Sequence, residues 1–303
     1  ATGYETAMKA FDDGYSIQAV SRQSGVHPVT LRAWERRYGL IRPARTERGH
    51  RRYSDQDLAV IEQILSWLDR GLPISQVRPV LEQGGSPVTA VAGPWRDALE
   101  DALQALEGHN LRRLEQLFQR LTADYPLGRV VTGFCDPLRD HLRALPGHGA
   151  SQALLDSFLR QKLAGRLLAR APGRRERAWL VMAVGDPLPA LIQAAVADRP
   201  VWCLETPVAW PALTPWLAEP RLTGVVWMLG ERPARRQIGQ LWPEQQPEGA
   251  FLCAGPALAG DPPTPAWLPC ESGDYQAVAK RMDDAESITQ QQGEQGATGL
   301  VSK

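Results

Sequence analysis

The segment over residues 15–38 constrains the fold more than any other part of the chain. It begins with a short helical pattern for which Ser16 can serve as the N-cap. Gly25 then permits a tight turn, and Pro28 stands where a second helix can start, because the first amide of a helix has no partner. The pattern predicts two short helices joined by a turn, the arrangement called a helix-turn-helix.

The second of these helices, expected over residues 29–38, has two different faces. Leu31 and Trp34 have the spacing of a core-facing pair, whereas the positions between them are polar. Arg32 and Arg36 carry guanidinium groups, which donate in a fixed fork that matches both guanine edges and phosphates. This composition predicts a helix that can enter the major groove of DNA.

Positive charge gathers in the same region of the chain. The whole sequence holds 34 basic and 34 acidic residues and is neutral, which excludes wholesale basicity of the histone type. Residues 22–52, however, hold nine arginines against two glutamates, a local charge of +7. Such a patch beside a helix-turn-helix favours nucleic acid as the partner. At its end we expect a two-stranded wing, residues 42–45 and 50–53, around a turn at residues 47–49.

Two strings within this region carry a specific resemblance. The string T-L-R-A-W-E-R-R-Y-G-L at residues 30–40, with G-H-R-R-Y at residues 49–53, resembles the winged helix-turn-helix domain of the MerR family of transcription regulators. The chain is most similar to a subgroup that pairs this domain with a cobalamin-type helical bundle and a Rossmann-like domain, and that includes regulators of curli and biofilm genes.

The resemblance implies DNA contacts at nine positions of the helix and the wing. His50 is expected to pack within the wing, and His27 to cap a turn or helix, rather than to hold a ligand. The DNA-binding candidates are Thr30, Arg32 and Arg36 in the major groove, Arg37 beside them, Tyr38, Arg45 and Tyr53 at phosphates, Arg51 at the backbone or in the minor groove, and His50.

The hydrophobic pattern of the rest of the chain falls into two regions, first helical spacing and then short apolar runs. Leucines at helical spacing over residues 95–172, broken near residues 108–110, 125–126 and 146–149, predict a bundle of about four helices. Short apolar runs then alternate with helix-compatible stretches, which predicts buried parallel strands in a doubly wound α/β domain. The expected strands are 179–184, 201–204, 224–229 and 250–254.

The expected fold class is therefore a multidomain α and α/β protein. Its parts, in order, are a disordered N-terminus (1–13), the winged helix-turn-helix domain (14–83), a linker (84–94), the helical bundle (95–172), a Rossmann-like doubly wound domain (173–286) and a disordered tail (287–303).

The resemblance also raises the question of a cofactor. Light- and cobalamin-sensing relatives carry D-x-H-x-x-G after the first sheet strand, with the histidine on cobalt. The corresponding residues 185–190 contain no histidine, and His148 is the last one in the chain. Clustered thiolates, the ligands of metal-sensing relatives, are missing too. We therefore expect no cofactor and no metal, although Arg232, Arg235 and Arg236 leave open an anionic ligand such as a cyclic dinucleotide.

Three functions fit these patterns to different degrees. The first is an activator that binds an inverted repeat in promoter DNA as a homodimer and, with RNA polymerase, realigns overlong promoter spacers by distorting the duplex. The second is a ligand-responsive repressor or sensor whose α/β domain controls oligomerisation. The third, an enzyme, is disfavoured because the α/β half offers no nucleophile, dinucleotide or metal-ligand motif.

The composition indicates the cellular compartment in which the protein is expected to work. The four cysteines are scattered and form no C-x-x-C pair, which suits a reducing compartment. No window reaches the ~18 apolar residues of a membrane span. We therefore expect a cytoplasmic protein without a membrane partner, whose C-terminal half can serve a signalling protein as a docking module.

Overall fold

The computed structural model describes residues 14–82, 95–197, 199–230, 238, 240–243, 245–247, 249–255, 258, 264–271 and 275–285. The chain divides into two compact units, residues 1–154 and 155–303. This division differs from the domain boundaries that the sequence suggested, because helices before residue 82 pack against helices after residue 95. The expected N-terminal segment, linker and tail lie wholly outside the described residues.

The first two helices are set by their caps. The helix α2 (Ile17–Ser24) starts at Ser16, whose hydroxyl accepts the amide of Ala19 at 3.2 Å, and it stops at Gly25 with a φ of 68°. The next helix, α3 (Pro28–Ala33), is capped by His27, whose Nδ1 accepts the amide of Val29 at 3.2 Å. The capping role expected for His27 is confirmed.

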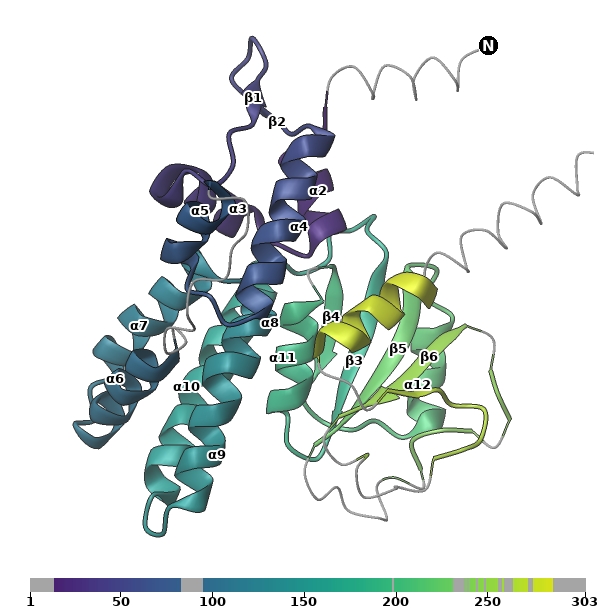
Figure 1. Cartoon of the computed structure of the whole chain (residues 1–303). Coiled ribbons are helices and arrows are strands. Elements are labelled where there is room, and N and C mark those ends of the chain that lie inside the picture. Colours follow the sequence, from purple (N-terminus) through teal and green to yellow (C-terminus); the bar gives the residue numbers. More distant parts are fainter. Residues whose placement is uncertain are drawn as a thin grey trace, which may run out of the picture. The chain divides into compact units, whose positions relative to one another are not determined.

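The second helix does not continue as one regular α-helix to Tyr38. It widens into the π-helical turn η1 (Trp34–Tyr38) and ends at Gly39, which has a φ of 60°. A short hairpin follows, and Figure 1 shows that it projects beyond the helices of its unit. Its strands β1 (Ala44–Arg45) and β2 (Arg51–Arg52) run antiparallel, with Ala44 opposite Arg52.

Two helices complete the region before residue 82. The helix α4 (Asp55–Asp69) begins with a capping box in which Ser54 and Asp57 satisfy each other's backbone amides. The helix α5 (Ile74–Glu82) follows and packs against α4.

Helical segments occupy residues 95–168, with breaks at the three expected places. The helix α6 packs against α7 and α9, while α8, η2 and α9 run on as one irregular helix that begins after Pro126. The bounds are α6 (Trp95–Glu107), α7 (Leu111–Asp124), α8 (Leu127–Val130), η2 (Val131–Cys135), α9 (Asp136–Ala144) and α10 (Gly149–Leu168).

The second unit contains a parallel five-stranded sheet in the order β4-β3-β5-β6-β7. The four expected strands are confirmed, and the two-residue β7 was missed because it has no apolar run of its own. The strands and labelled helices of the second unit are β3 (Ala178–Val184), α11 (Leu188–Val196), β4 (Val201–Leu204), α12 (Trp210–Leu217), β5 (Leu222–Leu229), β6 (Ala250–Ala254) and β7 (Cys270–Glu271).

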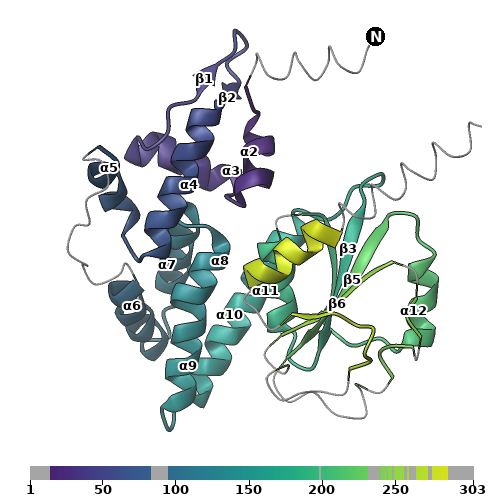
Figure 2. The ribbon, with the colours of Figure 1, turned by 45° about the vertical axis from the view of Figure 1, so that its right-hand side comes forward.

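Each face of this sheet is covered by a hydrophobic layer. Ala190 of α11 and Met282 of a helix over residues 275–285 belong to one layer, whereas Leu213 of α12 belongs to the other. Figure 2 shows α12 on one side of the sheet and the other two helices on the opposite side. Both faces are therefore buried, which explains why the strands read as continuous apolar runs.

Within the ranges described above, no helix is both long and apolar enough to cross a membrane.

One carboxylate in the first unit is held in an unfavourable environment. Asp136 starts α9 and is partly buried, and the loss of hydration raises its pKa to about 6 despite the opposing effect of Arg139. Because the folded-state pKa lies above the unfolded value, the folded state binds more protons between about pH 4 and pH 6. The free energy of unfolding therefore falls as the pH rises through this window.

We expect Asp136→Asn to stabilise the protein at about pH 7.5 by about 1–3 kcal/mol, since the amide needs no ionisation. The gain should nearly vanish at about pH 4, where the wild-type carboxyl is protonated. Urea unfolding at both pH values measures the difference, with Asp97→Asn at an exposed position of α6 as the control. Equal gains at the two pH values would contradict the burial argument.

Candidate nucleic-acid interface

The helix formed by α3 and η1 presents one exposed face. Arg36 is exposed, Arg32 is partly exposed, and the described residues offer neither side chain a hydrogen-bond or ion-pair partner. Val29 lies on the same face, three residues before Arg32, and is 49% exposed. The sequence analysis missed Val29. It could have been found from its position, because Val29 is an apolar residue in helical register with Arg32 and Arg36. Apolar side chains can contact a thymine methyl group.

Thr30 does not belong to that face. It is buried, and it shares its side of the helix with the fully buried Trp34, four residues on. The helix packs against α7. The burial of Thr30 argues against the expected contact with the major groove, because the face that carries it is used for packing.

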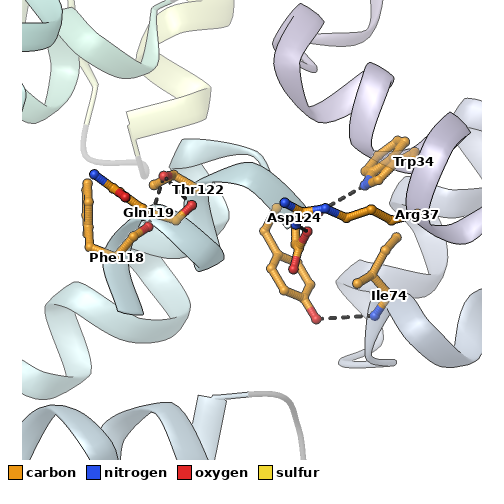
Figure 3. A network of polar contacts seen from close by, with 8 residues as sticks. Trp34, Arg37, Ile74, Phe118, Gln119, Thr122 and Asp124 are labelled. Atoms are coloured by element: carbon orange, nitrogen blue, oxygen red, sulfur yellow. Dashed lines mark hydrogen bonds and ion pairs between the residues drawn. The ribbon is translucent and has the colours of Figure 1, made fainter. Parts of the chain in front are cut away.

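Arg37 also turns away from the face of Arg32 and Arg36. Its Nη1 lies 2.7 Å from Oδ1 of Asp124, at the end of α7, although the side chain remains 56% exposed. The indole Nε1 of Trp34 donates to the backbone oxygen of the same Asp124 at 2.9 Å (Figure 3). Arg37 is therefore neutralised within the chain, which the sequence could not indicate because its partner lies 87 residues away.

The two tyrosines expected at phosphates are tied to the protein interior. Tyr53 is completely buried, burial raises its pKa to about 12, and its hydroxyl has no hydrogen-bond partner among the described residues. Tyr38 is partly buried, and its pKa is raised by burial and by the charge of Asp124. The burial of the Tyr53 hydroxyl argues against the phosphate contact expected of this residue.

The arginines of the hairpin fall into two groups. Glu35 holds Arg51 at 2.5 Å and Arg45 at 3.1 Å, and the Arg51 side chain is only 19% exposed. Arg42 and Arg48 are exposed and have no partner within the described part of the chain. The contact with the DNA backbone or minor groove that was expected of Arg51 stays a prediction, and the structure pairs its charge with Glu35. This pair anchors the hairpin to η1.

His50 is exposed, so the expectation that it packs within the wing is wrong. Its backbone closes the hairpin instead, since its carbonyl accepts the amide of Thr46 at 2.9 Å. Two residues that matter here were missed by sequence reasoning: Arg48 at the turn and Glu35 as the anchor. The first could have been found from its place at the predicted turn. The pairing of Glu35 depends on tertiary structure.

Other surfaces could hold small molecules. A cavity of about 600 Å³ lies between α6 and α9, lined by leucines, a tryptophan, a proline and three polar residues. After β3, where cobalamin-type relatives place a histidine, Gly185-Asp186-Pro187 offers no imidazole. No group of three or more potential metal ligands gathers among the residues with described positions. The polar residues of the cavity are Arg96, Glu100 and His141.

Arg232, Arg235 and Arg236, the candidates for an anionic ligand, lie outside the described residues.

Comparison with known proteins agrees with this geometry. The model of the MerR helix-turn-helix family of regulatory proteins matches residues 15–84. The chain belongs to the MerR family of helix-turn-helix transcription regulators. Within it the chain is of the MlrA type: it is 33% identical to the HTH-type transcriptional regulator MlrA of Escherichia coli K12 over 239 residues, which cover 76% of this chain and 95% of that protein.

The chain is also similar to a transcriptional repressor and a transcriptional activator. The HTH-type transcriptional repressor CarH of Myxococcus xanthus is 29% identical over 180 residues, which cover 55% of this chain and 60% of CarH. The HTH-type transcriptional activator TipA of Streptomyces coelicolor is 39% identical over 69 residues, 22% of this chain and 27% of TipA. The protein is thus a DNA-binding transcription regulator, from a family that binds promoter DNA and typically acts as dimers. We call α3 with η1 the recognition helix and β1–β2 the hairpin.

We expect Arg32→Ala to weaken binding to a duplex selected from random sequences by about 1–3 kcal/mol and to relax its preference at one base pair, because the shortened side chain no longer reaches a base edge. Fluorescence anisotropy with the selected and single-substituted duplexes measures both effects. Arg112→Ala, an exposed arginine of α7, is the control. Unchanged affinity and preference would show that Arg32 does not read bases.

Arg48→Ala should weaken selected and scrambled duplexes equally and lower the slope of log K against log salt by about one, since a free cation that meets a phosphate releases a counterion. Arg51→Ala should change the slope less, because Glu35 already neutralises this guanidinium. The measurement is binding over a series of salt concentrations. A larger slope change for Arg51 than for Arg48 would reverse the assignment.

Proposed function

We propose that this regulator activates promoters whose −35 to −10 spacers are overlong, by binding an inverted repeat as a homodimer and distorting the duplex so that RNA polymerase can engage both elements. The observation that carries the DNA-binding part is the open face of the recognition helix, where Val29, Arg32 and Arg36 are at least partly exposed. The free cations Arg42 and Arg48 supply phosphate contacts beside it.

The architecture supports this proposal. We infer that the hairpin is a wing, because it follows the recognition helix directly and Glu35 anchors it there. We also infer that the second unit is a doubly wound, Rossmann-like domain, from its parallel strand order and its two covered faces. In this role it serves oligomerisation or a signalling partner. The resemblance to curli and biofilm regulators supports genes of that kind as targets.

Five of the nine candidate residues take distinct roles within this proposal. Arg32 and Arg36 read bases, and Arg45, which stays half exposed beside Glu35, lies near the backbone. Arg37 and Arg51 hold the reading surface in place rather than contacting DNA.

The test begins with capture of genomic fragments by the full-length protein at physiological salt, followed by transcription in vitro from a captured promoter. We expect activation from the native spacer and loss of activation when the spacer is shortened to the usual length, because realignment is then unnecessary. An Arg32→Ala, Arg36→Ala double variant is the control for dependence on specific binding. Transcription that falls on adding protein to normally spaced promoters would identify a repressor.

A ligand-responsive repressor or sensor is the second candidate, and the cavity between α6 and α9 is the observation that favours it. A thermal-shift panel of cobalamins, cyclic dinucleotides and nucleotides separates the two candidates. A shift that also changes DNA affinity would favour the sensor.

A further inference from the structure

The end of α7 contacts three residues of two elements, η1 and α5. The backbone oxygen of Asp124 accepts the indole N–H of Trp34 at 2.9 Å, and its carboxylate pairs with Arg37 at 2.7 Å. The hydroxyl of the next residue, Tyr125, accepts the amide of Ile74, the first residue of α5, at 3.2 Å. Figure 3 shows Trp34, Arg37 and Ile74 on one side of Asp124. We call Asp124 and Tyr125 the α7 terminus.

These contacts satisfy groups that would otherwise be buried without partners. Trp34 is completely buried, so its indole N–H has no access to water. The amide of Ile74 is one of the orphan donors at the start of a helix. A buried donor without a partner loses its hydration and gains nothing in return, so separating the α7 terminus from these helices is unfavourable.

Residues outside the α7 terminus also contribute contacts that hold these helices together. The ring of Trp95 lies 4.9 Å from the ring of Tyr125, and a side chain at Gly133 would collide with Trp95. Arg129 donates to the backbone oxygen of Leu65 in α4 and pairs with Asp69. Helices after residue 95 therefore hold the recognition helix, α4 and α5 together.

The recognition helix packs toward α7 with one side and exposes its base-reading residues on another. Thr30, Trp34 and Arg37 face the α7 side, while Val29, Arg32 and Arg36 stay at least partly exposed. The docked arrangement thus leaves the base-reading residues accessible. It also fixes the rotation of the helix about its own axis, and this rotation decides which side chains meet the base edges.

We propose that Asp124, supported by Tyr125, is a positioning residue for DNA recognition. It aims Arg32 and Arg36 at the groove without touching DNA, and it makes the helical segment after residue 95 part of the DNA-reading unit. This inference rests on the assignment of the recognition helix as the reading element. The helix-turn-helix and hairpin alone are then an incomplete reader.

The test compares full-length variants on the selected and scrambled duplexes. Asp124→Asn keeps the backbone acceptor for Trp34 but loses the charge that holds Arg37. Tyr125→Phe removes the acceptor for the Ile74 amide without changing charge. We expect each to lower the ratio of selected to scrambled affinity by roughly 3- to 10-fold, and the salt slope to stay near that of the wild type.

Matched controls separate positioning from charge and from folding. Asp101→Asn removes an equal charge from a partly exposed pair with Arg113, and should leave the ratio unchanged. Arg37→Ala should lower the ratio in the same direction as Asp124→Asn, and the loss in the double variant should be smaller than the sum of the two single losses, because both variants remove the Arg37–Asp124 pair. Affinities are referred to the active fraction found by stoichiometric titration, so unfolded protein does not enter the ratio.

The outcomes are distinct. Tighter binding by Asp124→Asn would mean that Asp124 merely competes with DNA for Arg37, and it would overturn the proposal. An unchanged ratio in Asp124→Asn and Tyr125→Phe would overturn it too. If Arg32→Ala has no effect either, the assignment of the recognition helix has failed. If Arg32→Ala weakens binding while these two variants do not, only the positioning role has failed.

Discussion

The burial of Trp34 is the constraint on which the first unit depends. The indole of Trp34 is fully buried, and its N–H donates to the backbone oxygen of Asp124. Once this bond is made, the recognition helix is oriented, its Thr30 side is closed, and its Arg32 side faces outward. This hydrogen bond joins distant parts of the sequence, and together with the Arg37–Asp124 and Tyr125–Ile74 contacts it accompanies the exposure of the reading surface.

Charge in this region is divided by tertiary structure into reading groups and holding groups. Of the nine arginines in residues 22–52, Arg37, Arg45 and Arg51 are held by two carboxylates, Asp124 and Glu35. These pairs are partly solvated, so they contribute little to stability. Their value lies in orientation: they fix the hairpin and the recognition helix so that the unpaired guanidinium groups present a defined surface.

Local patterns predicted most of the fold. Ser16, His27 and the break at Pro126 each act within a few residues, so the helix limits were readable, and the apolar runs of β3 to β6 revealed a sheet buried on both faces. The site was harder. Thr30 and Arg37 look like DNA contacts beside Arg32, and only the packing of α7 separates them. The two-residue β7, made by pairing with β6, has no local signature. What could not be predicted depends on partners far away in sequence.

The place of Gly133 has a consequence for how such regulators can be recombined. Its missing side chain admits the ring of Trp95, which in turn supports Tyr125 beneath α5. A hybrid that joins the first 82 residues to the remainder of another family member would carry the reading surface without the Trp95 and Tyr125 contacts that support it. Such an exchange therefore depends on whether the other chain offers equivalent contacts. A fusion point after Gly133 keeps these contacts together, whereas one in the glycine-rich sequence before residue 95 does not.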